Sequence, residues 1–582
     1  MISQLRRELA SKLEEILEIS VGENDIFSSE FSDLSSTIAF KIGKEIGENP
    51  VTLAEKFRER IERANIELIE RVESLNGYLN FFLNYELILT RLWNEILEKK
   101  ENYGKGTRRK EKIILEHTSI NPSGPVHVGR LRNSLIGDAL SRILKFYGYE
   151  VETHYYVNDI GKQIAMITMA EIWNIKPDPE VVKSYKEYAE KNDFKVFFTY
   201  VSANRLYEKD EKFREEVDNL IKRAELGDRK ALAMIKSVAK KCLDGQKKIY
   251  EILGINFDFY DFESNFIETN EVFNVIEKLK QTKFWRKADF GDGLDLSSFG
   301  IERASKLSVL LRKDGTTTYL ARDIAYHLYK MKLGDLLLNV LGEDHKLEFQ
   351  ELKTILEKIL NLEKKLEAVH FSFVNFQGLQ MSTREGRIFP VDKLIDLAIE
   401  KAKAEIRKRG KGREADAALV GIGAIKYHLL KTSPMKPINF SWKAALNFEG
   451  DSAPYIQYAH ARCCSILKKE FGEDSFLEKT LNFLSSCDPI SASKLEENEK
   501  KLILQILRFP EVVENSAKEY KPNILANYLY DLSYIFNKFY YECPVLKSEK
   551  KIKCRRLFLV YTTKLILANG LYLLGIKALD VM

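Results

Sequence analysis

His127 and Gly129 stand where a loop rich in proline and glycine meets an amphipathic stretch. The first turn of a helix has unpaired N–H groups and a partial positive charge, so such a junction attracts phosphate. Gly129 lets a ligand approach the backbone closely because glycine has no Cβ. His127 can donate a hydrogen bond to a phosphate oxygen without carrying a permanent charge. The pair predicts a phosphate-binding loop; the alternative is an ordinary turn with a solvated histidine.

Three neighbouring segments would position this loop. Residues 113–115 form a short apolar run that is typical of a buried strand. The stretch 131–144 repeats apolar residues at helical spacing, with one apolar stripe. A second strand is expected at 151–156, with Val151, His154 and Tyr156. Together the segments predict a β-loop-α-β unit, in which the loop joins the first strand to the helix.

The residues around the loop resemble the nucleotide-binding signature of class I arginyl-tRNA synthetases. The match extends over residues 116–122, 127–129, 131–133, 137–138 and 156–163. The resemblance implies that His127 and the helix near Gly129 hold the phosphates of ATP, with the help of Mg²⁺. It also implies that Glu116, Ser119 and Asn121 hold the amino-acid head of the substrate.

Tyr319 and Asp323 match a Tyr-x-x-x-Asp pair of the same family. In the family this carboxylate meets the guanidinium group of arginine, and carboxylates suit the bidentate hydrogen bonds of a guanidinium. Alternation through Thr316 and Thr318 predicts a strand that runs into a helix from Asp323. Without the family context, a helix cap at Asp323 and a core position for Tyr319 are an equally good interpretation.

The apolar run 336–341, interrupted only by Asn339, predicts a central parallel strand. It ends at Gly342, and open α/β sheets bind ligands beyond the carboxyl ends of their strands. Asp344 and His345 follow after Glu343. They occupy the position at which the resembled family completes its substrate pocket.

A second signature follows a predicted strand at 369–374. Residues 377–387 resemble the mobile basic loop of the family, which closes over ATP and neutralises charge on the leaving pyrophosphate. The resemblance implies that Met381, Ser382 and Thr383 bind ATP, and that Ser382 and Arg384 take part in catalysis. Without the resemblance, the stretch reads as a polar surface loop.

A turn dipeptide at 76–77 and the aromatic run after it predict a strand in an N-terminal α+β domain. This domain resembles the N-terminal additional domain of the family, where such a strand contacts the D-loop of the transfer RNA. Asn80 and Phe82 are the candidate contacts, because aromatic faces stack on unpaired bases. The alternative is that the aromatic residues of this strand belong to the core of the domain.

Residues 452–462 match the start of the family's anticodon-binding helical bundle. Tyr455, Tyr458 and Arg462 lie on one predicted helix, and tyrosine and arginine can stack on and pair with single-stranded RNA. For the two tyrosines, a place between packed helices is an equally good interpretation.

The composition predicts a soluble globular protein of three or four domains, with 582 residues, 45% hydrophobic and 30% charged. A net charge of +5 neither requires nor excludes a nucleic-acid partner. The sequence contains neither a signal peptide nor an apolar run of spanning length, so we expect a cytoplasmic protein without a membrane partner. The six cysteines form no Cys-x-x-Cys pair, which predicts reduced thiols and neither a zinc site nor a disulfide framework.

These patterns and the resemblance divide the chain into three parts. Residues 1–110 form the N-terminal α+β domain. Residues 111–436 form an α/β Rossmann-type nucleotide-binding catalytic domain with a helical insertion at about 170–300. Residues 437–582 form an all-α anticodon-binding bundle. We expect the chain to act as a monomer.

The chain departs from the family at the charges that the mechanism needs. Arg130 replaces the second histidine of His-x-Gly-His, and Gln380 and Glu385 replace lysines of the second signature. Gly124 stands where synthetases that lack such a lysine often carry another. In one interpretation Arg130 supplies the missing phosphate charge, and the enzyme is active. In the other, the chain is a diverged paralogue that binds transfer RNA but has weak or altered activity.

Retention of the substrate-binding residues favours the active enzyme. It would convert arginine and ATP to arginyl-adenylate, and then pass the arginyl group to the 3′ terminal adenosine of tRNA(Arg). Such a reaction depends on positioning and charge stabilisation. The resemblance further implies that activation waits for bound transfer RNA. A third hypothesis, a nucleotidyltransferase with a small-molecule acceptor, does not explain the N-terminal and C-terminal stretches that resemble RNA-binding domains.

Overall fold

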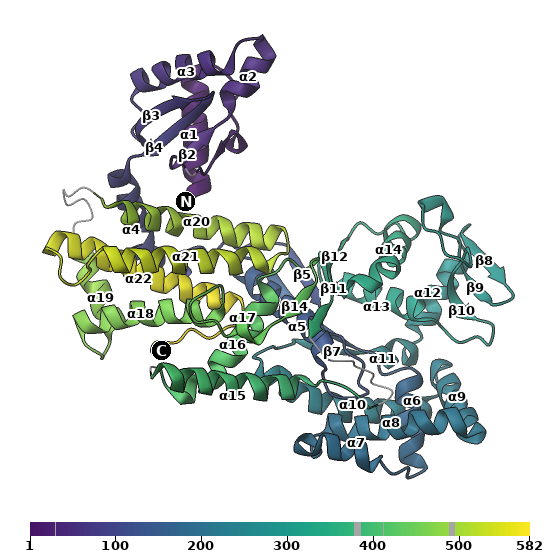
Figure 1. Cartoon of the computed structure of the whole chain (residues 1–582). Coiled ribbons are helices and arrows are strands. Elements are labelled where there is room, and N and C mark those ends of the chain that lie inside the picture. The colour runs from purple at the N-terminus through teal and green to yellow at the C-terminus, as the bar shows by residue number, and fades with distance from the viewer. Residues whose placement is uncertain (30, 377–385, 411, 488–494) are drawn as a thin grey trace.

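The computed structural model describes residues 1–29, 31–376, 386–410, 412–487 and 495–582. Figure 1 shows the N-terminal domain at the top, a bundle of long helices at the left and the catalytic part at the centre and right. The N-terminal end of the chain lies near α20 of the bundle, and the C-terminal end lies near α15 and α16. In the described part of the chain, no helix is long and apolar enough to cross a membrane.

The N-terminal domain is a four-stranded antiparallel sheet covered by helices, with strand order β1-β2-β4-β3. The predicted turn at 76–77 joins β3 to β4, and both Asn76 and Gly77 have positive φ, as a two-residue hairpin turn requires. The elements are α1 (Ile2–Leu17), β1 (Ile26–Phe27), β2 (Leu34–Ser36), α2 (Ile38–Ile46), α3 (Pro50–Ala64), β3 (Ile69–Leu75), β4 (Tyr78–Leu83) and α4 (Tyr85–Lys99).

The catalytic domain contains a five-stranded parallel sheet of order β12-β11-β5-β6-β7. The chain order reverses between β5 and β11, and this switch point is where open α/β sheets bind nucleotides. The strands are β5 (Lys112–Glu116), β6 (Glu150–Val157), β7 (Phe259–Phe262), β11 (Leu336–Gly342) and β12 (Lys365–Phe371), and α5 (Val128–Phe146) connects β5 to β6. The predicted Rossmann-type fold and its β-loop-α-β unit are confirmed.

Between β6 and β11 the chain is mainly helical, as predicted, but it also forms a small antiparallel sheet of order β10-β9-β8. Figure 1 shows two lobes here, one with α6–α10 and one with α12–α14 and the small sheet. The elements are α6 (Lys162–Ile172), α7 (Pro179–Ser184), α8 (Asn192–Lys209), α9 (Glu211–Glu225), α10 (Arg229–Ile252), α11 (Glu263–Glu268), α12 (Glu271–Lys280), β8 (Trp285–Ala288), β9 (Gly291–Leu294), β10 (Ser308–Arg312) and α13 (Tyr319–Leu333), with α14 (Lys346–Thr354) following β11.

The predicted strand through Thr316 and Thr318 is wrong. The N–H of Arg312 donates to the carbonyl of Thr316, so the chain turns back on β10, and Thr317 forms only one isolated bridge. Helix α13 starts at Tyr319, earlier than the predicted start at Asp323. Asp323 therefore lies inside the helix and is not its cap.

The C-terminal part is a bundle of long helices, as predicted, apart from the short strand β14, which pairs with β13. Its core is apolar and shares buried contacts with α1, α4 and α5. The connecting elements β13 (Val374–Phe376), α15 (Val391–Arg409) and α16 (Ala417–Leu430) lead from the catalytic domain to the C-terminal part. The C-terminal elements are β14 (Ile438–Phe440), α17 (Trp442–Ala445), α18 (Ala453–Phe471), α19 (Phe476–Ser485), α20 (Glu497–Lys518), α21 (Pro522–Glu542) and α22 (Lys550–Leu573).

The expectation of reduced cysteines is wrong for one pair. Cys487 and Cys554 form a disulfide that ties the end of α19 to α22, with 6.5 Å between their Cα atoms. The sequence could not show this pairing, because the two residues are 67 positions apart and meet only when the bundle has packed. Cys242, Cys463, Cys464 and Cys543 are free and buried.

Candidate active site

The first-signature loop is fixed by the helix that follows it. Asn133 of α5 accepts a hydrogen bond from the N–H of Thr118 (2.8 Å) and donates to the carbonyl of Val340 in β11 (3.0 Å). Thr118 and Ser119 both have positive φ, a conformation that persists only where the surroundings determine it. One side chain of α5 therefore sets the shape of the backbone at the switch point.

His127 is the residue that precedes α5, and its side chain lies against the protein interior. Burial, followed by repulsion from the exposed Arg130, lowers the pKa of His127 to about 4. The imidazole is therefore neutral at pH 7, and its buried Nδ1 has no hydrogen-bond partner in the described residues. This agrees with a neutral donor or acceptor at the start of the helix.

Backbone hydrogen bonds hold the chain that follows the second signature beside the first signature. The N–H of Val128 donates to the carbonyl of Phe389 (3.0 Å), and the N–H of Val391 donates to the carbonyl of Val126 (2.8 Å). The chain that leaves the second signature therefore runs along the first. Met381, Ser382, Thr383 and Arg384, together with Gln380 and Glu385, lie outside the described residues, so their predicted roles stay predictions.

Arg132 anchors α5 to the chain that leads into the helical bundle. Its buried guanidinium donates to four backbone carbonyls, those of Ser372, Thr432, Ser433 and Lys436, at 2.7–3.3 Å. Burial lowers the pKa of Arg132 to about 10, which still leaves it charged at neutral pH. No feature of the sequence distinguishes this structural arginine from the exposed Arg130 two positions earlier.

Glu116 ends β5 and is almost fully buried. One carboxylate oxygen accepts from the hydroxyl of Ser119 (3.1 Å), and the other accepts from Nζ of Lys330. Asn121 is exposed, and its amide donates to Oε1 of Gln163 (3.4 Å). The three residues predicted to hold the amino-acid head thus lie in one loop, within a few residues of the end of β5.

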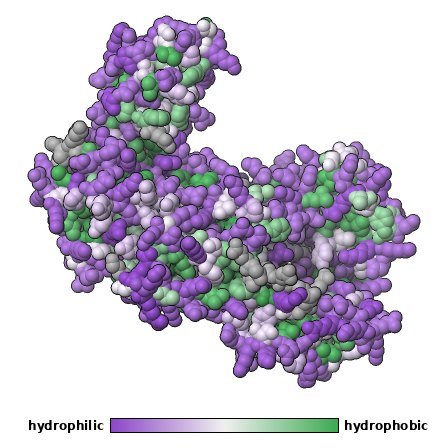
Figure 2. Space-filling model, in the orientation of Figure 1, coloured by the Kyte–Doolittle hydropathy of each residue, from purple (hydrophilic) through white to green (hydrophobic). Residues whose placement is uncertain are grey.

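Two neighbouring cavities open beside these residues and share Asn158 and Tyr319 in their walls. The first, of about 380 Å³, also includes Asn121 and Gln163. The second, of about 470 Å³, also includes Asp323. Figure 2 shows a largely hydrophilic surface that is hollowed at the right, between the lobe with α12–α14 and the lobe with α6–α10.

Tyr319 and Asp323 both face this region from the first turns of α13. Tyr319 is 57% exposed, which excludes the interpretation that it belongs to the core. The side chain of Asp323 is 38% exposed. Burial would raise the pKa of Asp323, but the neighbouring His327, including its hydrogen bond, together with Lys330 and His345 lowers it. Asp323 is therefore ionised at neutral pH and offers a carboxylate to a cationic ligand.

Asp344 and His345 follow β11 as predicted, but only one of them lines the pocket. His345 lines the second cavity, whereas Asp344 is not among its lining residues. Nε2 of His345 lies 3.7 Å from Oδ2 of Asp344, and both side chains are about half exposed.

Three residues near the candidate pocket were missed by the sequence reasoning: His327, Lys330 and Asn339. His327 and Lys330 are four and seven positions after Asp323, so helical spacing places all three on one face of α13. Asn339 was visible as the single polar residue of an apolar strand. The helical spacing and the polar residue in the strand are both visible in the sequence. They indicate a shared cluster only once the fold brings β5, β11 and α13 together.

Gly124 occupies a closed position. Its carbonyl accepts hydrogen bonds from Nε2 of Gln246 (2.7 Å) and from the thiol of Cys242 (3.4 Å). A Cβ added to Gly124 would lie 3.1 Å from the Cβ of Phe197, closer than ordinary packing allows. The lysine that related synthetases carry at this position does not fit here without movement of α8.

In the N-terminal domain, the two predicted RNA contacts differ in exposure. Asn80 is buried and accepts hydrogen bonds from the hydroxyls of Ser35 (2.7 Å) and Ser32 (3.4 Å), so its side chain supports the sheet. Phe82 is half-buried, and the guanidinium of Arg71 lies 3.5 Å from its ring centre. Contact with RNA stays a prediction for both residues.

In the helical bundle, Tyr455, Tyr458 and Arg462 follow one face of α18, and all three are half-buried. The guanidinium of Arg462 lies 4.8 Å from the ring centres of both Tyr458 and Tyr540. Tyr458 and Arg462, but not Tyr455, line a cavity of about 960 Å³. Its wall has two acidic residues, Glu473 and Asp580, and a larger set of basic and aromatic residues: Tyr458, Arg462, Lys468, Lys469, Tyr540, Tyr541 and Lys547. The lining residues on α21 and beyond were missed, because they lie about eighty positions from α18 and share no local motif with it.

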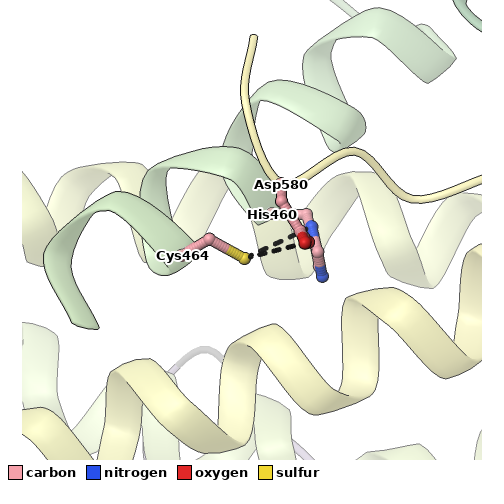
Figure 3. A group of neighbouring side chains, drawn as sticks. All are labelled: His460, Cys464 and Asp580. Atoms are coloured by element: carbon pink, nitrogen blue, oxygen red, sulfur yellow. Dashed lines mark hydrogen bonds between the residues drawn. The ribbon is translucent and has the colours of Figure 1, made fainter. Parts of the chain in front are cut away.

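His460, Cys464 and Asp580 form a group of potential metal ligands where the C-terminal tail crosses α18 (Figure 3). The potential ligand atoms of this group already take part in hydrogen bonds. Nδ1 of His460 donates to the carbonyl of Leu579 (2.9 Å), and the thiol of Cys464 donates to Asp580 (3.5 Å). A metal ion would have to break the His460 bond and would leave the other ring nitrogen buried with a proton and no acceptor. The group fits an anchor for the tail better than a metal site.

Comparison with protein families gives a match along nearly the whole chain. The model for "tRNA synthetases class I (R), catalytic domain" matches residues 93–442. The model for "Arginyl tRNA synthetase N terminal domain" matches residues 3–83, and that for "DALR anticodon binding domain" matches residues 456–582.

Individual proteins give the same result. The chain is 39% identical over 569 residues to the Arginine--tRNA ligase of Methanocaldococcus jannaschii, which covers 96% of this chain and 95% of that protein. It is 37% identical over 559 residues to the Arginine--tRNA ligase of Archaeoglobus fulgidus, with 95% and 96% covered. Among solved structures, the arginyl-tRNA synthetase of Thermus thermophilus superposes with a TM-score of 0.79 at 27% identity, covering all of both chains.

Proposed function

The chain belongs to the class I arginyl-tRNA synthetases, and we propose that it joins arginine to tRNA(Arg) at the expense of ATP. The full-length similarity to proteins named Arginine--tRNA ligase supports this function, and no comparison favours the diverged paralogue. The observation that carries the proposal is a pair of carboxylates, Glu116 and Asp323, at the switch point of the sheet. Arginine has two positive groups, an α-ammonium and a guanidinium, and the pair offers one carboxylate to each.

Asp323 would bind the guanidinium. Its lowered pKa keeps it ionised, and its partial burial strengthens a charge-assisted, bidentate hydrogen bond. Tyr319, which borders both cavities, would lie along the side chain of arginine. His345 would border the far side of this pocket, and Asp344 would support it from outside.

Glu116, Ser119 and Asn121 would hold the amino-acid head. Glu116 would accept from the α-ammonium group, with Ser119 fixing the carboxylate through its hydroxyl. The exposed amide of Asn121 would donate to the carboxylate of arginine, which must point toward the α-phosphate of ATP. This arrangement sets up in-line attack by positioning, with no covalent bond to the protein.

ATP would bind at the start of α5, with Mg²⁺ arriving on its phosphates. The N–H groups near Gly129 and the neutral imidazole of His127 would donate to phosphate oxygens as negative charge develops. The exposed guanidinium of Arg130 would add the positive charge that the family takes from other residues. Met381, Ser382, Thr383 and Arg384 of the second signature would close over the nucleotide.

Transfer RNA would contact the enzyme at two surfaces beyond the catalytic domain. In the bundle, Tyr455, Tyr458 and Arg462 would stack on and pair with bases of the anticodon loop, the last two at the basic and aromatic cavity beside α18. In the N-terminal domain, the strand with Asn80 and Phe82 would face the D-loop. The proposed enzyme acts as a monomer in the cytoplasm, where translation takes place.

Charging of a transfer-RNA pool with labelled arginine tests the proposal, using the wild-type chain and Asp323→Asn. The substitution keeps the shape of the side chain but removes its charge, so kcat/KM for arginine should fall about 100-fold or more. Asp474→Asn, at an exposed position of the bundle, is the matched control and should charge like the wild type.

Two outcomes would contradict parts of the proposal. Unchanged use of arginine by Asp323→Asn would remove the pocket assignment. Tight binding of transfer RNA by the wild-type chain without charging would instead indicate the diverged paralogue.

A further inference from the structure

The single polar residue of strand β11 faces a buried polar cluster. Asn339 is 2% exposed. In the register of the sheet it pairs with Glu116, which belongs to the neighbouring strand β5. The amide of Asn339 reaches two residues of α13, since Oδ1 accepts from Nζ of Lys330 (3.2 Å) and Nδ2 donates to Nε2 of His327 (2.7 Å). The cluster formed by Asn339, His327 and Lys330 thus connects the two central strands to the helix that carries Asp323.

The hydrogen bonds determine where the proton of His327 lies. Nε2 of the ring faces two donors, the amide of Asn339 and, at 3.2 Å, the ammonium of Lys330. A nitrogen that accepts cannot also carry a proton, so the neutral ring must be protonated at Nδ1. That proton points at Asp323, whose Oδ1 is 3.0 Å and whose backbone carbonyl is 2.9 Å from Nδ1.

Lys330 connects the cluster to the other carboxylate. Its side chain is fully buried, and its ammonium donates to Oε2 of Glu116 and Oδ1 of Asn339. Its third contact, with Nε2 of His327, shares the single lone pair of that nitrogen with the amide of Asn339. A buried ammonium is stable only when it is paired and hydrogen-bonded, and Glu116 supplies the opposite charge. The position of Glu116 is therefore tied to the same cluster that orients Asp323.

We propose that Asn339, His327 and Lys330 are positioning residues that hold the two carboxylates at the separation and orientation that the two positive ends of arginine require. This inference rests on the proposed function, in which Glu116 meets the α-ammonium and Asp323 meets the guanidinium. Lys330 holds the carboxylate of Glu116, and His327 holds the carboxylate of Asp323. Asn339 fixes the side-chain conformation of Lys330 and the tautomer of His327, so that both contacts form. None of the three touches the substrate.

The arrangement has a consequence for specificity. A ligand must present two positive groups at the distance that separates the carboxylates of Glu116 on β5 and Asp323 on α13. The cluster holds this distance constant. Loss of the cluster should therefore weaken the binding of arginine without changing the binding of ATP, which lies beside α5.

The test is Asn339→Leu, measured as KM for arginine, for ATP and for transfer RNA in the charging assay. We expect KM for arginine to rise about tenfold, because the buried groups of His327 and Lys330 lose partners and reorient. KM for ATP should stay within twofold of the wild-type value. Gln457→Leu makes the same change at a fully buried amide in α18 and should leave KM for arginine unchanged.

Asn339→Asp provides a second variant of nearly the same size, in case Asn339→Leu does not fold. It keeps an acceptor for Lys330 but places an acceptor opposite Nε2 of His327, which forces a proton onto that nitrogen. KM for arginine should rise again. A folded variant of either kind whose KM for arginine lies within twofold of the wild-type value overturns the inference.

An analogue without the α-ammonium group, 5-guanidinopentanoate, separates the two carboxylates. As a competitive inhibitor it reports the guanidinium end, so its inhibition constant should also rise in Asn339→Leu. An unchanged constant overturns the part of the inference that concerns Asp323. Failure of the proposed function itself is distinguished by Asp323→Asn, whose unchanged use of arginine would remove the pocket and not only its support.

Discussion

Restoring the missing lysine at position 124 should damage this enzyme instead of improving it. The Cβ of any residue added at Gly124 would lie 3.1 Å from the Cβ of Phe197 and 3.2 Å from its Cδ2. The first contact cannot be relieved by a change of rotamer, because the position of a Cβ is set by the backbone. Phe197 is fully buried in α8 among Phe194, Phe198 and Val201, so the helix itself would have to move.

The cost can be estimated in two steps. Overpacking of a buried position costs about 1–3 kcal/mol, so Gly124→Ala should lower the free energy of unfolding by that amount. Gly124→Lys should cost more, because the long side chain must also carry its ammonium out of an interior where Gln246 and Cys242 already occupy the neighbouring carbonyl. We also expect KM for ATP not to fall.

Denaturant unfolding and the charging assay measure these two effects. Gly22→Lys is the matched control, since an added Cβ at this exposed glycine meets its nearest atom at 3.5 Å. A Gly124→Lys enzyme that is as stable as the wild type and binds ATP more tightly would refute the packing argument.

Three further predictions concern charge, pH and the disulfide. Arg130→Ala should raise KM for ATP about tenfold and leave KM for arginine unchanged in the charging assay; the reverse pattern would contradict the proposed phosphate role. Burial lowers the pKa of His127, His428 and His460 to about 4 and that of His117 to about 3. The unfolded chain takes up these protons near pH 6.5, so each histidine should cost up to about 1.4 kcal/mol per pH unit as the pH falls from 6.5 to 4. Buried carboxylates act the other way, because burial raises the pKa of Asp193 to about 6, that of Glu263 to about 7, and that of Asp33, Asp159, Glu225, Asp392 and Asp531 above its usual value. We expect the histidines to dominate, and a thermal-unfolding series that is flat over this window would contradict that expectation. Cys487→Ser should lower the unfolding free energy of the bundle by up to about 4 kcal/mol, with Cys242→Ser as a control that does not respond to reductant.

The sequence was a good guide where the determinants are local. The apolar runs at 113–115 and 336–341 became β5 and β11, and the Asn-Gly dipeptide at 76–77 became a hairpin turn. The Pro/Gly-rich loop before α5 was placed correctly because its composition, its position after a strand and the helix that follows all indicate the same structure. The strand expected at 316–318 failed because alternation over three residues cannot compete with the turn at Gly315.

Residues whose role depends on distant partners could not be predicted. Arg130 and Arg132 are two positions apart, yet one is exposed and the other donates to four carbonyls, three of them about 300 positions away. The chemistry of an arginine is the same in both places, so only the packing of the bundle against α5 separates them. The disulfide could not be predicted for the same reason, because the spacing of two cysteines in the sequence does not show which helix ends meet in the fold.

The departures at positions 124 and 130 are linked by this geometry. A lysine at 124 would have to emerge through the wall formed by α8, whereas position 130 opens to solvent at the start of α5, where the phosphates are proposed to bind. A positive charge can therefore be supplied at 130 without disturbing the buried aromatic cluster, and the same charge helps to keep His127 neutral. Arg130 would thus replace a charge that the tight packing at Gly124 excludes, so the departures at positions 124 and 130 compensate for one another.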